Sequence, residues 1–225
     1  MKEKIIIACS KKWFFKNQKV KKYIKKKNIL ILQKKDYLNE KYLKKVNPKI
    51  IFFPHWSYKV KENIIKKYRC ICFHTAPLPY GRGGSPIQNL IIRNFKKSPI
   101  CAIKMTNKID AGPIYMKKTI SLSGNLNKIF ERMAEKIIQM IIILSKKNIK
   151  PKKQRGKIYN FKRLSEQPEI IKERKIEEIF DKIRMLDSDD YNNAYIKNNN
   201  LKIYLSNPKK KKNYIICDAK IFKLK

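Results

Sequence analysis

The chain has 225 residues, of which 43% are hydrophobic, and its 56 basic and 17 acidic residues give a formal net charge of +39. This length and apolar content exclude a disordered chain and allow one substantial α/β domain with a small appendage. The N-terminal apolar run is too short for a signal peptide and no apolar stretch reaches the ~20 residues of a membrane span, so we expect a soluble, cytoplasmic protein that does not contact a membrane.

Strands and helices are predicted to alternate through the first third of the chain. Continuous β-branched and apolar runs predict buried strands at Lys4–Cys9, Ile29–Leu32, Ile50–Phe53 (ending at Pro54) and Cys70–Phe73. Apolar residues at helical spacing predict helices at Phe14–Lys27, Tyr37–Val46 and Lys61–Tyr68. The expected fold class is therefore α/β, a mainly parallel Rossmann-like sheet with helices on both faces.

The next segment adds one capped helix, two strands and a long helix. Ser85 is expected to be the N-cap and Pro86 the first residue of a helix that runs over Ile87–Asn94. Strands are predicted at Ile100–Met105 and Ile114–Ile120, followed by an amphipathic helix at Leu126–Lys146.

A basic, polar segment at residues 148–158, which contains Pro151 and Gly156, predicts a linker. It divides the chain into a catalytic domain at 1–147 and a C-terminal subdomain at 159–225. That subdomain is expected to hold a helix and a small β unit, at Ile176–Leu186, Ala194–Ile196, Lys202–Leu205 and Tyr214–Cys217. Lys209–Lys212 indicates a solvated hairpin turn.

Several common sites are not supported. No GxGxxG follows the first strand, and the Gly81–Gly84 loop lacks the Gly-Lys-Ser/Thr ending of a phosphate-binding loop. The five cysteines form no CxxC pair, so they indicate reduced thiols, and we expect no metal site because His55 and His74 are the only histidines.

The most informative stretch is His74–Gln88, HTAPLPYGRGGSPIQ, with Asp110-Ala111-Gly112-Pro113-Ile114 downstream. In parallel sheets, ligands bind outside the carboxyl ends of the strands, where His55, Trp56 and His74 are expected. A histidine and a carboxylate presented together from strand ends form a pair that can move a proton.

These two stretches resemble the motif blocks of the folate-dependent formyltransferases. The family has a strand ending Asn-x-His and a loop S-L-L-P-x-x-R-G-x-x-P-I-Q, followed by M-x-x-x-x-D-T/A-G-x-I/M. This chain matches both blocks without a gap, through Cys72-Phe73-His74, Ala76-Pro77-Leu78-Pro79, Arg82-Gly83, Pro86-Ile87-Gln88, Met105 and Asp110–Ile114. The resemblance covers Lys4–Lys146, with a weaker similarity over Ile176–Leu205.

The resemblance implies an enzyme that moves a formyl group from 10-formyltetrahydrofolate to a primary amine. His74 would transfer the proton, and Asp110 would hold the imidazole and favour its charged form as the oxyanion develops. The structural alternatives are a strand-end histidine with satisfied hydrogen bonds and a turn-forming aspartate. Residues expected to bind the folate are Trp56, Tyr58, Pro79, Arg82, Gly83 and Asp110. Both aromatic residues could equally pack within their loop.

Cys72 departs from the family pattern, because it replaces the asparagine that donates a hydrogen bond to the oxyanion. A thiol is a weak donor, and loss of one oxyanion donor typically costs about 10²–10³ in rate. Three explanations stay open. A backbone N–H or His74 could take over this role, Cys72 could act covalently, or the chain could be a slow or inactive homologue.

The sequence favours a nucleotide-linked aminosugar as the amine. Ile29–Lys49 leaves no room for the basic insertion with which methionyl-tRNA formyltransferases grip tRNA, and the C-terminal β unit is short. The alternative acceptor is initiator methionyl-tRNA, and a binding protein without catalysis is a further alternative. The net charge of +39 can reflect nucleic-acid affinity or A/T-rich codons, since only eight of the 56 basic residues are arginines. The oligomeric state is open, a homodimer included.

Overall fold

The centre of the protein is a six-stranded sheet with the strand order β2-β1-β3-β4-β6-β7. The computed structural model describes residues 4–26, 29–164, 168–171 and 173–224. Four strands run parallel, namely β1 (Ile5–Cys9), β2 (Ile29–Leu32), β3 (Ile50–His55) and β4 (Cys70–His74). Two strands are antiparallel to their neighbours, β6 (Lys97–Lys104) and β7 (Ile114–Ser121). The predicted mainly parallel sheet is confirmed.

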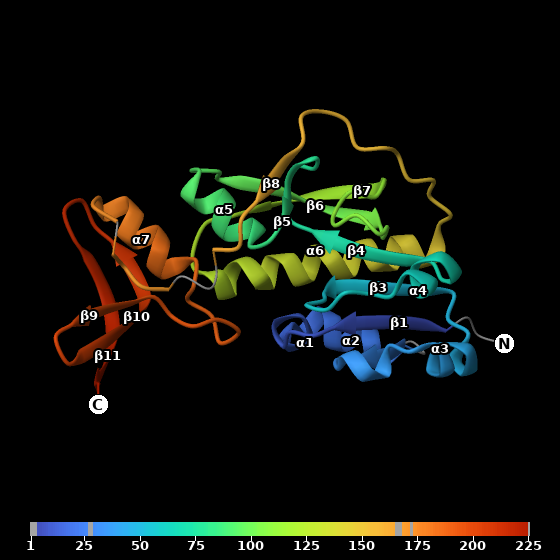
Figure 1. Cartoon of the computed structure of the whole chain (residues 1–225), viewed down its shortest axis with the longest axis horizontal. Coiled ribbons are helices and arrows are strands. Elements are labelled where there is room, and N and C mark those ends of the chain that lie inside the picture. The colour runs from blue at the N-terminus through green and yellow to red at the C-terminus, as the bar shows by residue number, and fades with distance from the viewer. Residues whose placement is uncertain (1–3, 27–28, 165–167, 172, 225) are drawn as a thin grey trace.

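Helices cover both faces of this sheet, as expected (Figure 1). Along β1, Ile7 packs into the cluster on one face and Ile6 into the cluster on the other, because side chains alternate along a strand. The first face is covered by α1 (Trp13–Lys16), α2 (Gln18–Lys26) and α6 (Leu126–Lys146). The second face is covered by α3 (Glu40–Val46) and α4 (Glu62–Lys67).

The helix predicted at Phe14–Lys27 is two helices, and Lys27 lies outside the described residues. Asn17 separates them in an extended conformation, because its side chain accepts hydrogen bonds from the backbone N–H groups of Lys19 and Val20 and so starts α2. The predicted helix at Tyr37–Val46 likewise begins later. Tyr37 is instead the last residue of η1 (Lys35–Tyr37), a 3-10 turn, and Asn39 then caps α3.

The structure differs from the sequence prediction at one proline and at one serine. Pro54 lies inside β3 rather than ending it, because the β1–β3 register shifts at this point and no ladder hydrogen bond from residue 54 is needed. Ser85 precedes α5 (Pro86–Ile92), but its side chain makes no capping bond. Its Oγ instead accepts from the backbone N–H of Leu164 at 3.0 Å.

The C-terminal part contains α7 (Ile176–Arg184) and a three-stranded antiparallel sheet, drawn in orange and red in Figure 1. The strands are β9 (Tyr195–Asn198), β10 (Leu201–Lys210) and β11 (Ile215–Lys223), longer than predicted. Lys209 and Lys210 therefore belong to β10 and not to the turn. Ile183 and Leu205 share the core cluster of α6, so this part packs against the main sheet assembly.

A smaller pairing joins distant segments, since β8 (Tyr159–Phe161) lies parallel to β5 (Tyr80–Gly83). Within the described ranges, no helix is long and apolar enough to cross a membrane.

Candidate active site

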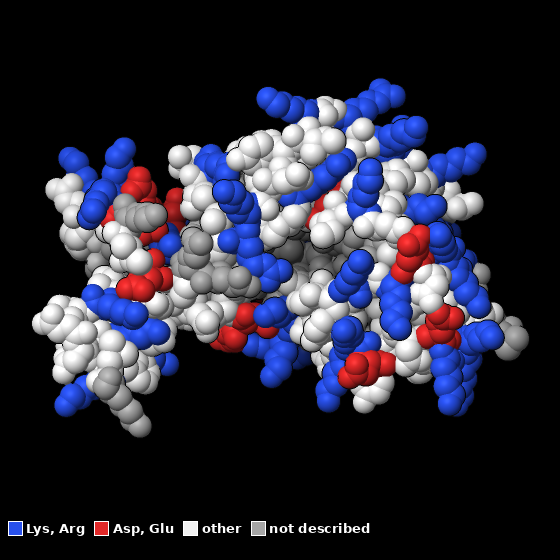
Figure 2. Space-filling model, in the orientation of Figure 1, with Lys and Arg blue, Asp and Glu red and all other residues white. Residues whose placement is uncertain are grey.

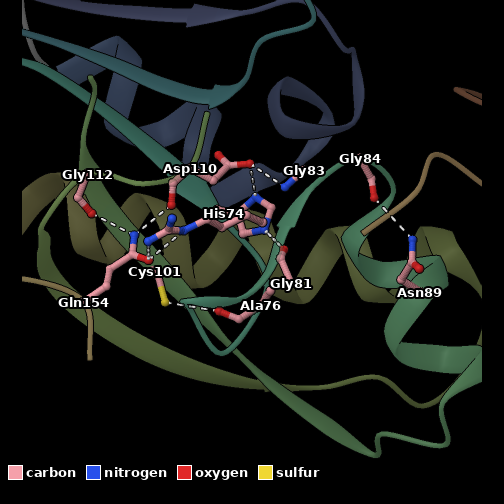
Figure 3. Close-up of polar contacts among 11 residues, drawn as sticks. His74, Ala76, Gly81, Gly83, Gly84, Asn89, Cys101, Asp110, Gly112 and Gln154 are labelled. Atoms are coloured by element: carbon pink, nitrogen blue, oxygen red, sulfur yellow. Dashed lines mark hydrogen bonds and ion pairs between the residues drawn. The ribbon is translucent and has the colours of Figure 1, made fainter. Parts of the chain in front are cut away.

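His74 ends β4 at the carboxyl edge of the sheet, and its side chain is buried. Its Nε2 lies 2.6 Å from the carbonyl oxygen of Gly81, and its Nδ1 lies 3.4 Å from Oδ2 of Asp110 (Figure 3). A carbonyl only accepts hydrogen bonds, so Nε2 must carry a proton in this arrangement. Nδ1 is then the ring nitrogen whose protonation can change during a reaction.

Asp110 has a left-handed backbone and a side chain that is hydrogen-bonded to the His74 loop. Its backbone has a φ of 50°, the left-handed region that non-glycine residues seldom occupy. Its Oδ2 also accepts a hydrogen bond from the backbone N–H of Gly83 at 3.0 Å. The structure therefore joins His74, Asp110 and Gly83, three of the residues to which the sequence assigned a role.

Two glycines in the motif loops lie where a side chain would not fit. At Gly81, which has a φ of 89°, an added Cβ would lie 2.6 Å from the ring of Phe161. At Gly112, an added Cβ would lie 1.7 Å from the carbonyl oxygen of Lys104. A side chain at Gly112 would thus force the Asp110 loop away from β6.

We expect Gly112→Ala to destabilise the protein by about 3 kcal/mol, because the contact with Lys104 is to backbone and cannot be relieved by a rotamer change. Denaturant unfolding of the two proteins measures this difference. Gly84→Ala is the control, since its Cβ would meet Arg163 at 3.2 Å, and we expect a loss below about 1 kcal/mol. Equal unfolding midpoints for the two variants would refute the prediction.

Cys72 lies on β4 two residues before His74 and is partly buried. Burial raises the pKa of its thiol far above the usual range, and the nearby charge of Asp110 raises it further. The thiol is therefore protonated at neutral pH and is a poor nucleophile. This favours the explanations in which Cys72 takes no covalent part.

The second histidine, His55, is unsuited to proton transfer. Its Nδ1 accepts a hydrogen bond from Nε1 of Trp13 at 3.3 Å. Burial, together with the positive charge of Lys11, lowers the pKa of His55 to about 4. A base this weak is neutral at physiological pH and is already occupied by its tryptophan partner.

The remaining predicted folate contacts fall into two groups. Pro79 and Arg82 lie in the His74 loop, where the Pro79 carbonyl accepts from the N–H of Tyr159 at 3.4 Å. Trp56 and Tyr58 follow β3 and form an edge-to-face pair with their ring centres 5.3 Å apart. Nε1 of Trp56 is buried and has no hydrogen-bond partner among the described residues.

The sequence did not single out Gln154, whose side chain bridges the two motif loops through four hydrogen bonds. Its Oε1 accepts from Nε and Nη2 of Arg82 at 3.1 and 2.8 Å. Its Nε2 donates to the carbonyl oxygens of Asp110 and Gly112 at 2.7 and 2.8 Å. The sequence shows only that Gln154 lies three residues after Pro151 in a polar segment. Such a position gives no indication of a functional site.

Acidic, cysteine and histidine side chains do not gather into a metal site in the part of the chain that the structure describes. The groups that define the site are a histidine, a carboxylate and backbone amides. These groups suit proton transfer and hydrogen bonding to a developing charge.

Comparisons with known proteins agree with this arrangement. A family model described as "Methionyl-tRNA formyltransferase, C-terminal domain" matches residues 165–222. The methionyl-tRNA formyltransferase of Rickettsia massiliae is 33% identical over 120 residues, which are 50% of this chain and 39% of that protein. The chain thus spans well under half the length of this curated relative.

Solved structures extend the similarity to the whole chain. The structure of a methionyl-tRNA formyltransferase from Clostridium thermocellum is 41% identical and covers 98% of this chain and 99% of its own, with a TM-score of 0.92. A likely sugar N-formyltransferase from Mycobacterium tuberculosis has a TM-score of 0.69 over 93% of this chain and 100% of its own, but only 15% identity, which shows the fold alone. The chain belongs to the folate-dependent formyltransferase family, as its motifs indicated.

Proposed function

We propose that this protein transfers the formyl group of 10-formyltetrahydrofolate to the amine of methionyl-tRNA. The observation that carries the proposal is the contact of His74 with Asp110 at 3.4 Å, in the family's motif positions. The 41% identity to a methionyl-tRNA formyltransferase structure, over 98% of this chain and 99% of that one, supports the acceptor. This identity favours the alternative acceptor that the sequence left open over the aminosugar, because the sugar formyltransferase structures that match are only 15–17% identical.

In the proposed reaction, the amine nitrogen attacks the formyl carbon, and the bond from that carbon to the folate nitrogen breaks. The amine loses a proton, and the folate nitrogen gains one as it leaves. With Nε2 held as a donor by Gly81, the Nδ1 lone pair of His74 and Oδ2 of Asp110 form two neighbouring acceptors. Such a pair can bind the amine and take its proton, and the carboxylate then stabilises the imidazolium.

The folate is proposed to lie along the His74 loop, near Arg82, Gly83 and Pro79, with Trp56 and Tyr58 as stacking residues. The buried, unpartnered Nε1 of Trp56 supports this, since a buried donor without an acceptor is costly unless a ligand supplies one. In the same proposal, residues 1–147 hold the chemistry, and 159–225 contact the acceptor.

A face of the C-terminal sheet has the composition of a nucleic-acid contact. The strand register places Lys202 and Tyr204 of β10 beside Tyr195 of β9 and Phe222 of β11, all on one face. Nζ of Lys202 lies 4.0 Å from the ring centre of Tyr195 and 4.8 Å from that of Tyr204. Aromatic rings interleaved with lysines bind single-stranded nucleotides by stacking and charge. Figure 2 shows basic side chains spread over the visible face, whereas acidic ones gather in a few places.

We expect Tyr204→Ala to raise the KM for methionyl-tRNA by about tenfold and to leave the KM for 10-formyltetrahydrofolate unchanged, since loss of one stacked base costs about 1–3 kcal/mol. Lys202→Ala should reduce the salt dependence of tRNA binding. Tyr37→Ala, which alters an exposed tyrosine outside this face, is the control. An equal rise in KM for Tyr37→Ala would remove this face from the proposal.

The acceptor is tested by offering 10-formyltetrahydrofolate with methionyl-tRNA and, separately, with a panel of nucleotide-linked aminosugars. Formylation of methionyl-tRNA alone supports the proposal. Formylation of a sugar alone would overturn the proposed acceptor but would support formyl transfer from the folate as the reaction. Folate binding without transfer to either acceptor would overturn the proposed activity and favour the inactive homologue.

A further inference from the structure

The segment 148–158 lies against both motif loops. Lys152 pairs with Ile114 in an antiparallel bridge, with N···O distances of 2.7 and 2.9 Å. Just beyond the segment, Tyr159 donates to the carbonyl of Pro79 at 3.4 Å. The chain is thus anchored to the Asp110 block on one side and to the His74 block on the other, which places Gln154 between them (Figure 3).

The Gln154 amide uses its full hydrogen-bonding capacity. Two bonds are accepted from the Arg82 guanidinium, and two are donated to the carbonyls of Asp110 and Gly112. Arg82 lies between Gly81, whose carbonyl contacts His74, and Gly83, whose N–H contacts the Asp110 carboxylate. The side chain therefore ties the backbone that holds the histidine to the backbone that holds the carboxylate.

We propose that Gln154 is a positioning residue for the His74–Asp110 pair. The left-handed backbone of Asp110 is unfavourable for a residue with a Cβ, so surrounding bonds must maintain it. Two of the groups beside this backbone, the carbonyls of Asp110 and Gly112, are held by Nε2 of Gln154. Loss of the amide would let the Asp110 loop move and would lengthen the contact between the carboxylate and the imidazole.

An amide is required at this position for a specific chemical reason. A glutamate would still accept from Arg82, but it has no N–H to donate and would place an oxygen against two carbonyl oxygens. A methionine has a similar length and no strong polar group. Gln154→Glu and Gln154→Met therefore remove the donors in two different ways, and Lys153→Ala is the control on the neighbouring exposed residue.

The kinetic test rests on the proposed function and uses the full chain with whichever acceptor it formylates. We expect kcat to fall about 10- to 100-fold in both variants, because a shift of about 1 Å in a catalytic group costs up to about 10²-fold. The KM for 10-formyltetrahydrofolate should stay near wild type in Gln154→Glu, which still accepts from Arg82, and the melting temperature should stay near wild type in both variants. An unchanged kcat, or a fall in kcat matched by a loss of folding in both variants, would overturn the proposal.

A second test is independent of the reaction. The chain has only two histidines, so the imidazole proton resonances of His74 and His55 can be followed by NMR as pH is varied. We expect the ring-proton resonances of His74 to shift in both Gln154 variants, because the carboxylate that lies 3.4 Å from Nδ1 in the wild-type protein moves away from the imidazole. His55, whose pKa burial lowers to about 4, is the internal reference. His74 resonances equal to wild type in both variants would overturn the positioning role even if no acceptor is found.

Discussion

His74→Ala is expected to lower the turnover of formyl transfer by about 10²–10⁴, the usual contribution of a positioned general acid or base. His74 is the histidine that faces a carboxylate, with Nδ1 lying 3.4 Å from Oδ2 of Asp110. The folate should still bind, because the contacts proposed for it come from the loop residues Pro79, Arg82 and Gly83 and not from the imidazole. Single-turnover rates and folate affinity, measured on the same variant, separate the two effects.

Two further variants sharpen this prediction. Asp110→Asn keeps an oxygen that can accept from Gly83 but removes the charge beside His74, so we expect a loss of about 10²-fold or more. His55→Gln is the matched control for a histidine that is occupied by Trp13, and its turnover should stay close to wild type wherever it folds. A His74→Ala enzyme with near-normal turnover would remove His74 from the mechanism.

Cys72→Asn is expected to raise turnover by up to about 10²-fold, because an amide N–H is a stronger donor to a developing oxyanion than a thiol. The position lies on β4, two residues before His74, where the family has asparagine. The pKa of the thiol is raised by burial and by the charge of Asp110, so the native side chain offers a neutral, weak donor. Pre-steady-state rates report the chemical step directly.

Cys70→Ala provides the control on the same strand, since Cys70 lies four residues before His74 and its side chain is buried in the cluster that contains α3 and α4 residues. The folded fraction of this variant should react at the wild-type rate. A complete loss of activity in Cys72→Asn, with the fold intact, would show that the thiol itself takes part. An unchanged rate would assign oxyanion stabilisation to a backbone N–H or to His74.

Most elements were predictable because their signals are local. The long helix α6 was predicted with the bounds Leu126–Lys146 that the structure shows, since one apolar stripe and a polar face persist over its whole length. The predicted helix and strand bounds were wrong at two kinds of position. In one, a side chain takes hydrogen bonds that the helix backbone would otherwise make, and in the other, a shift in strand register accommodates a residue that cannot donate to the ladder. Asn17 divides a helix in this way, and a register shift admits Pro54 into β3.

The residues of the candidate site divide along the same line. His74, Asp110 and Gly83 were identified because they lie in two motif blocks at the ends of predicted strands. Their relative geometry was not available from the motifs, since the contact between Nδ1 and Oδ2 depends on the left-handed backbone of Asp110. Nor did the motifs indicate that Cys72 is buried enough for its thiol to stay protonated.

Local patterns in the chain were sufficient for the α/β class, the helices, the strands and the motif blocks, because periodicity and strand-end chemistry are properties of short windows. The role of segment 148–158 depends on contacts between residues far apart in the sequence. Gln154 meets Arg82 across 72 positions and Asp110 across 44, and nothing in its own surroundings marks it. Hydrogen bonds between residues so far apart in the sequence form only once the sheet has placed both loops at one edge. The contacts of Gln154 beside His74 and Asp110 were therefore visible only in the tertiary structure.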